Sequence, residues 1–244
     1  MYALLKKELQ LFLSSLTGLM VLFVFLTING LLLFVFPSSF NIFDYGFASV
    51  EPFFQLAPFV FLFLIPALSM RSFAEERKIG TIEGLLSRPL TDMQIVLAKY
   101  SAILILLILA LIPCLTYIYT VSNLADPRGN VDMAAFWGAY MGLFLLGACF
   151  ASISLCMSSL TENQIVAFVL AVLTCAFFYL GFDFIASMGF FGKQDLIISY
   201  LGIQNHYVSL SRGVLDLRDI LYYISLIFFF ILCTKLSMQA IRWK

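Results

Sequence analysis

Residues 16–36 read LTGLMVLFVFLTINGLLLFVF, a run of 21 residues without a charge. A helix needs about 20 mostly apolar residues to cross a hydrocarbon core of about 30 Å. A run this long, without alternating polarity, favours a membrane helix over a barrel strand. It is also too long for the apolar part of a signal peptide, and no small-residue cleavage site follows. We therefore expect it to remain in the mature protein as a membrane span.

The composition of the whole chain agrees with this expectation. Of its 244 residues, 62% are hydrophobic and only 11% are charged, whereas soluble chains are about half apolar and about a quarter charged. The 14 basic and 14 acidic residues give a formal net charge of zero, so there is no electrostatic basis for binding nucleic acid. We expect the lipid bilayer as a partner and no nucleic acid.

The other apolar runs predict an all-α, polytopic membrane protein with six transmembrane helices in one domain covering residues 1–244. The spans are expected at about residues 16–36, 53–70, 98–119, 134–157, 165–182 and 220–238. With a cytoplasmic N-terminus, ten of the 14 Lys and Arg residues lie inside, and only Arg128, Lys193, Arg212 and Arg218 lie outside. This distribution follows the positive-inside rule and places both termini in the cytoplasm.

Residues 1–15 predict an amphipathic elbow helix on the inner membrane surface. Leu4, Leu9 and Phe12 recur at helical spacing, while charged residues such as Lys7 and Glu8 fill the other side. We expect Gly18 to mark the bend into the first span.

The inner loop at 71–90 is unusually rich in charge and in helix signals. Thr81 can cap a short helix at about 82–88, Glu83 lies in its first turn, and Pro89 ends it after Arg88. Gly80 separates this helix from a polar helical turn at 73–78. The loop can be a solvated segment that obeys the positive-inside rule. Alternatively, Leu85 and Leu86, exposed beside charges, make it a docking surface.

Two helix starts share a sequence pattern. LTDMQIV at 90–96 and LTENQIV at 160–166 both place Gln three residues after Thr. The pattern predicts capping boxes with Thr91 and Thr161 as N-caps.

Polar and small residues inside the spans are candidates for a conduit or for close helix packing. Thr27 and Asn29 lie in the first span, and intramembrane polar residues are functional candidates by default, although Asn also forms interhelical hydrogen bonds. Gly138 and Gly142 have the GxxxG spacing that permits close helix contact.

The outer segment at 187–218 either re-enters the membrane or lies on its outer surface. Its His206 is the single histidine of the chain, so we expect no ligand role for it.

No motif for catalysis, metal or nucleotide occurs. The five cysteines contain no CxxC pair, and GxxxxGK[ST], HExxH and GxSxG are all missing. We expect a protein that is no enzyme, has no catalytic residues, and binds no cofactor or metal. The energy for any transport must then come from a partner chain.

The inner loop resembles a known family. Met70, Arg71, Glu75, Glu76, Gly80, Thr81, Glu83, Leu85, Leu86 and Pro89 are similar to the M-R-x-x-x-E-E-x-x-x-G-T-x-E-x-L-L-x-x-P segment of type 2 ABC exporter permeases. The six spans and the elbow extend this likeness over the whole chain. Within the family, MYALLKKEL and EERKIGTIEGLL are most similar to gliding-motility permease subunits of Bacteroidetes.

The resemblance implies a permease in the bacterial cytoplasmic (inner) membrane that works with two copies of a cytosolic ABC ATPase and with a second permease chain, identical or related. ATP and Mg would bind to the ATPase. The loop 71–90 would be the coupling helix, with Glu75, Glu76, Gly80, Thr81, Glu83, Leu85 and Leu86 at the ATPase contact. The alternative is a structural or force-transmitting membrane anchor of a larger machine, without a conduit for solute.

Overall fold

The computed structural model describes residues 1–44, 46, 48–86, 90–189 and 195–242. These residues form helices and no strand, which confirms the predicted all-α fold. Among them, five helical stretches are long and apolar enough to cross a membrane, and a bent pair at the N-terminus supplies a sixth if it is counted as one span. The chain is therefore a polytopic membrane protein.

The helices follow one another in six groups along the chain. They are α1 (Tyr2–Ser14) and α2 (Leu16–Phe34); α3 (Glu51–Ser69), α4 (Arg71–Ile79) and α5 (Thr81–Leu86); α6 (Asp92–Leu111), the 3₁₀ turn η1 (Ile112–Cys114) and α7 (Leu115–Leu124); α8 (Met133–Leu160); α9 (Gln164–Ala176), the π-helix η2 (Phe177–Gly181) and α10 (Phe182–Ser187); and α11 (Asp195–Tyr200), α12 (Ile203–Ser211) and α13 (Leu217–Arg242).

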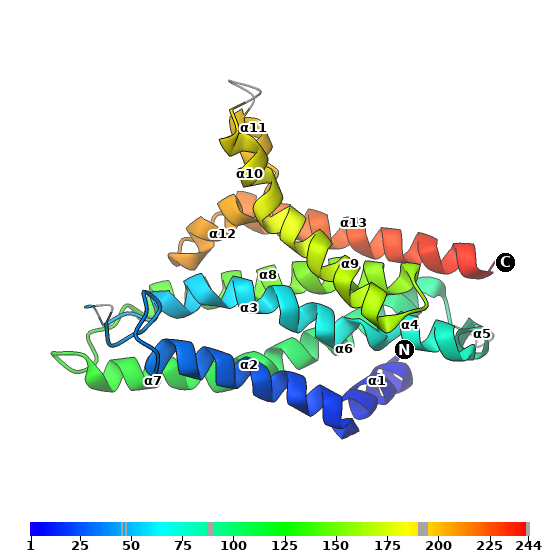
Figure 1. Cartoon of the computed structure of the whole chain (residues 1–244), viewed down its shortest axis with the longest axis horizontal. Coiled ribbons are helices and arrows are strands. Elements are labelled where there is room, and N and C mark those ends of the chain that lie inside the picture. Colours follow the sequence, from blue (N-terminus) through cyan, green and yellow to red (C-terminus); the bar gives the residue numbers. More distant parts are fainter. Residues whose placement is uncertain (45, 47, 87–89, 190–194, 243–244) are drawn as a thin grey trace.

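The long helix α8 forms the centre of the bundle. It packs against α3, α9, α12 and α13, and 78% of the residues in its most apolar stretch are buried. Small residues let its neighbours come close: a Cβ on Gly142 would lie 2.5 Å from Leu210 Cβ, and one on Gly147 would lie 2.6 Å from Leu107 Cδ2. Figure 1 shows both chain termini at the same end of the bundle as α4 and α5.

The elbow is present, but its bend lies before the residue that we expected. The chain between α1 and α2 is extended at Ser15 (φ −84°, ψ 133°), and the Ser15 hydroxyl accepts a hydrogen bond from Gly18 N at 3.1 Å. Gly18 lies so close to Phe12 that any side chain there would collide with it. Gly18 thus permits the close approach that follows the turn, whereas Ser15 makes the turn. The two helices differ in direction by 66°, and α1 packs against α6.

One of the two predicted capping boxes is confirmed and the other is wrong. Thr91 and Gln94 cap α6 reciprocally. At α9, however, the N-cap is Asn163, whose side chain accepts from Ile165 N at 2.9 Å. Because α8 continues to Leu160, only three residues make the turn, and Asn163 is the last of them. Asn is at least as good an N-cap as Thr. Asn163 is therefore the N-cap because it directly precedes the first residue of α9.

The outer segment folds back onto the bundle through α12. Ile203, Tyr207 and Leu210 are buried, and α12 packs against α8 and α3. The Tyr207 hydroxyl donates to Phe54 O at 2.7 Å. Burial raises the pKa of this phenol well above its ordinary value, so it keeps the proton that it donates. In Figure 1, α10 and α11 point away from the long helices before the chain returns through α12.

Candidate functional site

The candidate site is the end of the bundle where α4 and α5 extend the second apolar helix; we call it the inner end, because the distribution of Lys and Arg predicts that it faces the cytoplasm. The start of α4 is held by the hydroxyl of Ser158 on α8. This hydroxyl accepts from Phe73 N at 3.2 Å and from Ala74 N at 3.3 Å, and it lies 3.1 Å from Met70 O. Amide groups in the first turn of a helix need partners from outside that helix or turn. Ser158 supplies one from a distant part of the chain, and so joins α4 to α8.

A fully buried lysine joins α4 to two further helices. Lys99 Nζ on α6 lies 2.8 Å from Glu8 Oε1 on α1 and 3.0 Å from Glu76 Oε2 on α4. It also donates to Ser72 O at 2.6 Å and lies 5.0 Å from the centre of the Phe73 ring. A buried charge is tolerated only when it is paired and hydrogen-bonded, so this cation holds α1, α4 and α6 together.

The second carboxylate oxygen of Glu76 extends this cluster. Lys7 Nζ on α1 lies 3.3 Å from Glu76 Oε1, with the lysine half exposed. We call Lys7, Glu8, Glu76 and Lys99 the charge hub. Its two cations and two carboxylates balance, which keeps the net charge of the hub at zero.

The opposite side of α4 is braced by the turn between α8 and α9. Arg77 donates to Ser159 O at 2.7 Å and to Glu162 Oε1 at 3.1 Å. Ser237 on α13 donates to the same Ser159 carbonyl at 3.1 Å. The helix α4 is therefore fixed on both sides, by contacts with α1, α6, α8 and the turn that leads to α9.

Beyond this brace, the chain turns and exposes a short surface, which we call the tip and define as residues 78–84. Gly80 makes the turn in the left-handed region at φ +76°, a conformation that glycine adopts at little cost. Lys78, Ile79, Thr81 and Glu83 are exposed there, and Ile79 is 65% accessible. An exposed branched apolar side chain among charges is typical of a contact surface.

The residues expected at an ATPase contact divide into two sets in the structure. Gly80, Thr81 and Glu83 lie on the exposed tip, and Glu75 lines a neighbouring cavity of about 390 Å³ that also includes Ile79. Glu76 points inward to Lys99 instead, and its side chain is only 13% accessible.

The expected exposure of Leu85 is wrong, and α5 begins one residue earlier than expected. Leu85 is buried and lines a cavity of about 640 Å³ together with Ala3 and Leu4 of α1. The amphipathic turn of α5 directs this leucine back to the elbow. The helix covers 81–86, so Thr81 begins it rather than preceding it, and the Thr81 hydroxyl donates to Glu76 O at 3.4 Å. The Leu86 side chain and residues 87–89, with Arg88 and Pro89, lie outside the described residues.

A groove of about 990 Å³ runs beside the tip. Its walls come from the α4–α5 turn, the α8–α9 turn and the end of α13, and include Ile82, Glu83, Glu162 and Arg242. Arg242 pairs with Asp92 at 2.9 Å. The sequence pattern around Glu162 and the tip, 80 residues apart, thus border one concave surface.

The candidates inside the membrane do not come together. Asn29 is fully buried and donates to Phe25 O at 2.9 Å, within its own helix, whereas Thr27 lies on the exposed face of α2. Gly138 and Gly142 both face the returning outer segment, Gly138 against Gly213 and Gly142 against Leu210. The two glycines therefore serve packing within the chain.

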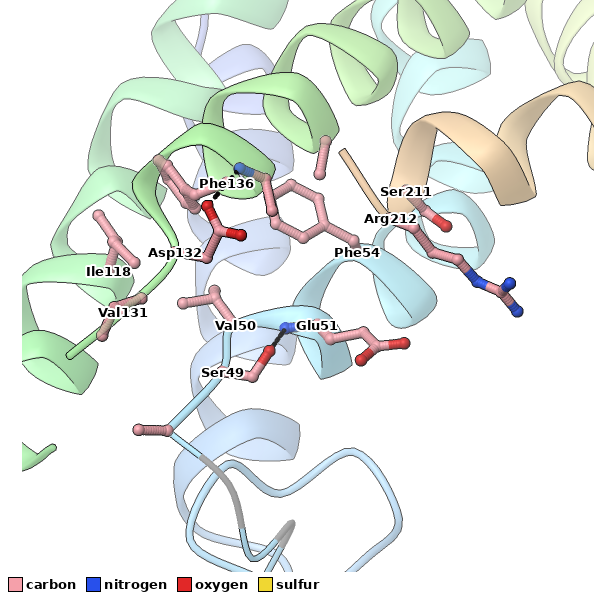
Figure 2. A pocket seen from close by; sticks show the side chains of 13 residues that line it. Ser49, Val50, Glu51, Phe54, Ile118, Val131, Asp132, Phe136, Ser211 and Arg212 are labelled. Atoms are coloured by element: carbon pink, nitrogen blue, oxygen red, sulfur yellow. Dashed lines mark hydrogen bonds between the residues drawn. The ribbon is translucent and has the colours of Figure 1, made fainter. Parts of the chain in front are cut away.

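A second cleft, of about 240 Å³, lies at the outer end between the starts of α3 and α8 and the end of α12. Figure 2 shows that its polar groups mainly organise helix starts: Ser49 accepts from Glu51 N at 3.1 Å, and Asp132 accepts from Ala135 N at 2.9 Å. Arg212 extends away from the cleft in this view. The cleft thus has the character of a packing junction between helix starts.

The chain provides no constellation for metal binding in its described part, where no group of three His, Cys, Asp or Glu side chains could hold an ion. The site that the sequence analysis missed is the charge hub. A signal for it exists, because Lys99 is the single charge in the helical run between Asp92 and the end of α7. A lone cation at the start of a span must find carboxylates, but the sequence does not say which ones.

The comparisons with known proteins agree with this architecture. A family model described as ABC-2 family transporter protein matches residues 2–238. No curated protein matches the chain. Because the matched region covers nearly the whole sequence and the helices fit a multi-pass membrane protein, the chain belongs to the ABC-2 transporter family and is a membrane permease subunit of an ABC transporter.

Proposed function

We propose that this permease belongs to an ATP-driven exporter in the bacterial inner membrane and couples to a separate cytosolic ATPase through residues 71–90. The transporter would contain two ATPase copies and a second permease chain, identical or related. ATP and Mg would bind to the ATPase. This chain would contribute the membrane path and the contact that receives the motion.

The observation that carries the proposal is that the exposed tip follows directly on a helix, α4, that is fixed by contacts with its neighbours. Ile79 and Glu83 project at the inner end, while Ser158, Lys99 and Arg77 fix the helix directly behind them. A solvated loop whose charges only follow the positive-inside rule does not need these contacts from three other helices. A surface that transmits motion does need them, because packed elements move as rigid bodies and switch between discrete arrangements.

The structure also supports separate roles for the residues of the loop. We assign the direct ATPase contact to Ile79, Gly80, Thr81 and Glu83, with Glu75 at its edge. Leu85 anchors α5 to the elbow, and Leu86 stays a candidate for the contact. We assign Glu76 the role of passing motion from the tip to α1 and α6, since its carboxylate joins Lys7 and Lys99.

The resemblance of MYALLKKEL and EERKIGTIEGLL to the gliding-motility permease subunit GldF of Bacteroidetes supports a role in surface motility. The test is deletion of the gene in its native strain. Colonies should stop spreading, and the wild-type gene should restore spreading. Normal spreading of the deletion strain would remove motility from the proposal and leave the transporter assignment intact.

The docking surface is tested by purifying the tagged chain from its native membrane in mild detergent and identifying stoichiometric partners. We expect an ABC ATPase to co-purify. The double variant Ile79→Glu with Glu83→Lys should recover at least tenfold less of it, since losing contact residues at the centre of an interface costs more than about 1.4 kcal/mol. The matched control is Asp44→Lys, a charge reversal of an exposed carboxylate between α2 and α3, which should recover the wild-type amount.

Two outcomes would contradict the docking proposal. One is a double variant that inserts normally and retains the full amount of ATPase. The other is a wild-type chain that purifies without any nucleotide-binding partner.

The second candidate, a force-transmitting anchor without a conduit, is favoured by the position of Asn29 and Thr27. Asn29 is fully buried and donates its hydrogen bond within its own helix, and Thr27 is exposed. Enlarging Thr27 to Leu discriminates the two functions. An exporter that uses this face should lose cargo flux while the complex still assembles, whereas an anchor should keep all activities.

A further inference from the structure

The outer segment contains a histidine whose two ring nitrogens both face oxygen acceptors. His206 Nδ1 lies 2.7 Å from Asp219 Oδ1 on α13, and its Nε2 lies 2.9 Å from Tyr200 O on α11. A carboxylate and a carbonyl oxygen can only accept. Neutral imidazole has one N–H group and imidazolium has two. With Asp219 ionised, only the protonated ring satisfies both neighbours at once.

The faces of the ring favour the same charge state. His206 stacks on Tyr222 with ring centres 3.9 Å apart and planes 22° apart, and a cation is attracted to an aromatic face. The Tyr222 hydroxyl donates to Leu201 O at 2.6 Å, which fixes the position of that ring. Asp219 is buried, so its charge needs a partner in place.

We propose that His206 is a pH-sensitive pin that holds α11 and α12 against the start of α13 on the outer face. When the imidazole is protonated, the pin is closed, because Tyr200, Asp219 and Tyr222 all favour the cation. When the ring loses a proton, one of its two nitrogens no longer has an N–H group to donate. The hydrogen bond from that nitrogen to Asp219 or to the Tyr200 carbonyl is then lost. Histidine changes charge between about pH 5 and 8, so the outer segment is held more tightly at the acidic end of that range.

The charged and titratable surroundings of the pin are as follows. Asp219 and Tyr222 face it from α13, and Tyr200 faces it from α11. Asp183 on α10 accepts from Asn205, the neighbour of His206 in sequence. Tyr179 on η2 reaches α12 at Tyr207. The exposed charges of the same region are Arg212, Asp216 and Arg218. In the described contacts, α3 and α8 direct no charged side chain to the histidine.

The geometry does not support a nucleophile at this place, although Ser209 lies beside the pair. The Ser209 hydroxyl donates to the second oxygen of Asp219 and lies 3.1 Å from the His206 carbonyl. The nitrogen that would take its proton, Nε2, is occupied by the Tyr200 carbonyl. The three side chains thus form a clamp between α12 and α13.

The single histidine makes a direct test possible. The full chain, purified without a histidine tag and placed in lipid nanodiscs, is labelled with ¹⁵N-histidine, so both ring nitrogens of one residue are observed by NMR between pH 5.5 and 8.5. We expect both nitrogens to be protonated at pH 6. In Asp219→Asn, fewer of the rings should carry protons on both nitrogens at pH 6, because the facing carboxylate that accepts the Nδ1 proton is gone. The control Asp216→Asn, which changes an exposed carboxylate nearby, should leave that fraction unchanged.

The mechanical consequence is measured by amide hydrogen exchange, corrected for the intrinsic effect of pH. Peptides from residues 195–211 should lose about tenfold of their protection between pH 6 and pH 8.5, the loss expected for one charge-assisted hydrogen bond. Peptides from residues 164–176 should keep theirs. In His206→Gln, the pH dependence should vanish. A single neutral tautomer from pH 5.5 upward, equal fractions of doubly protonated ring in the two Asp variants at pH 6, or the same pH dependence in His206→Gln would each overturn the proposal.

Discussion

Replacing Lys99 by Met removes the buried cation and keeps an unbranched side chain that is one atom shorter. In the wild-type chain, Lys99 Nζ lies 2.8 Å from Glu8 Oε1 and 3.0 Å from Glu76 Oε2. The substitution leaves these two carboxylates close together without the cation between them. Removal of one partner from a buried ion pair costs about 3–5 kcal/mol. Here both carboxylate side chains retain some contact with solvent, at 15% and 13% accessibility, and Lys7 still pairs with Glu76.

We therefore expect a cost near the lower limit, about 3 kcal/mol, which corresponds to a factor of about 100 to 200 in the equilibrium for local opening. Hydrogen exchange of the chain in nanodiscs measures it. Amides of α1 and α4 should lose protection by that factor, whereas those of α8 should change far less. Lys78→Met, which removes an exposed cation from α4, is the matched control and should change protection by less than twofold.

The decisive comparison is the triple variant Lys99→Met, Glu8→Gln and Glu76→Gln. If the cost comes from charges left without a partner, neutralising both carboxylates should recover most of the lost protection, because buried ion pairs can be replaced by neutral groups at little net cost. The reasoning is refuted if the triple variant exchanges as fast as the single one. It is equally refuted if Lys99→Met behaves like Lys78→Met.

Two further predictions concern packing. Ser158→Ala should destabilise the chain by about 1–3 kcal/mol, measured as a lower thermal midpoint, since it leaves the amides of Phe73 and Ala74 buried without this acceptor. The control Ser152→Ala removes a hydroxyl bonded within its own helix and should change the midpoint far less. Equal shifts for the two variants would argue against a cap from α8. Gly142→Ala should loosen α12, because the new Cβ would lie 2.5 Å from Leu210 Cβ, so peptides of residues 203–211 should exchange faster. The control is Gly30→Ala, where an added Cβ would meet no atom of another residue within 4 Å, and it should be neutral or slightly stabilising. Unchanged exchange in Gly142→Ala would contradict the packing role.

The apolar runs predicted the helices well because length and hydropathy alone decide whether a helix can span a bilayer. The same reasoning failed where neighbours in space decide. Glu75 and Glu76 are adjacent in sequence and about 100° apart around α4, so their order alone could not show which one meets Lys99. Leu85 was expected to be exposed because charges surround it in sequence, but in the structure it is buried and lines a cavity together with Ala3 and Leu4 of α1.

The helix caps show the same limit on a smaller scale. Thr91 and Thr161 begin nearly identical segments, and only Thr91 caps a helix. The difference is the preceding helix, since α8 ends at Leu160 and leaves a tight turn. A local motif predicts that a helix starts nearby, and the length of the connection decides which residue starts it.

The order of the charge hub along the chain bears on how the protein is made. Glu8 and Glu76 leave the ribosome before Lys99, and until then both can stay in water at the membrane surface. When Lys99 enters the membrane boundary, its counter-charges are already synthesised, so assembly never requires an isolated cation in the hydrocarbon. The contacts from Ser158 and Glu162 come later, with the second half of the chain. The elbow helix α1 and the helix α4 can therefore pair while only the first half of the chain is synthesised, and the contacts from the second half are added to them afterwards.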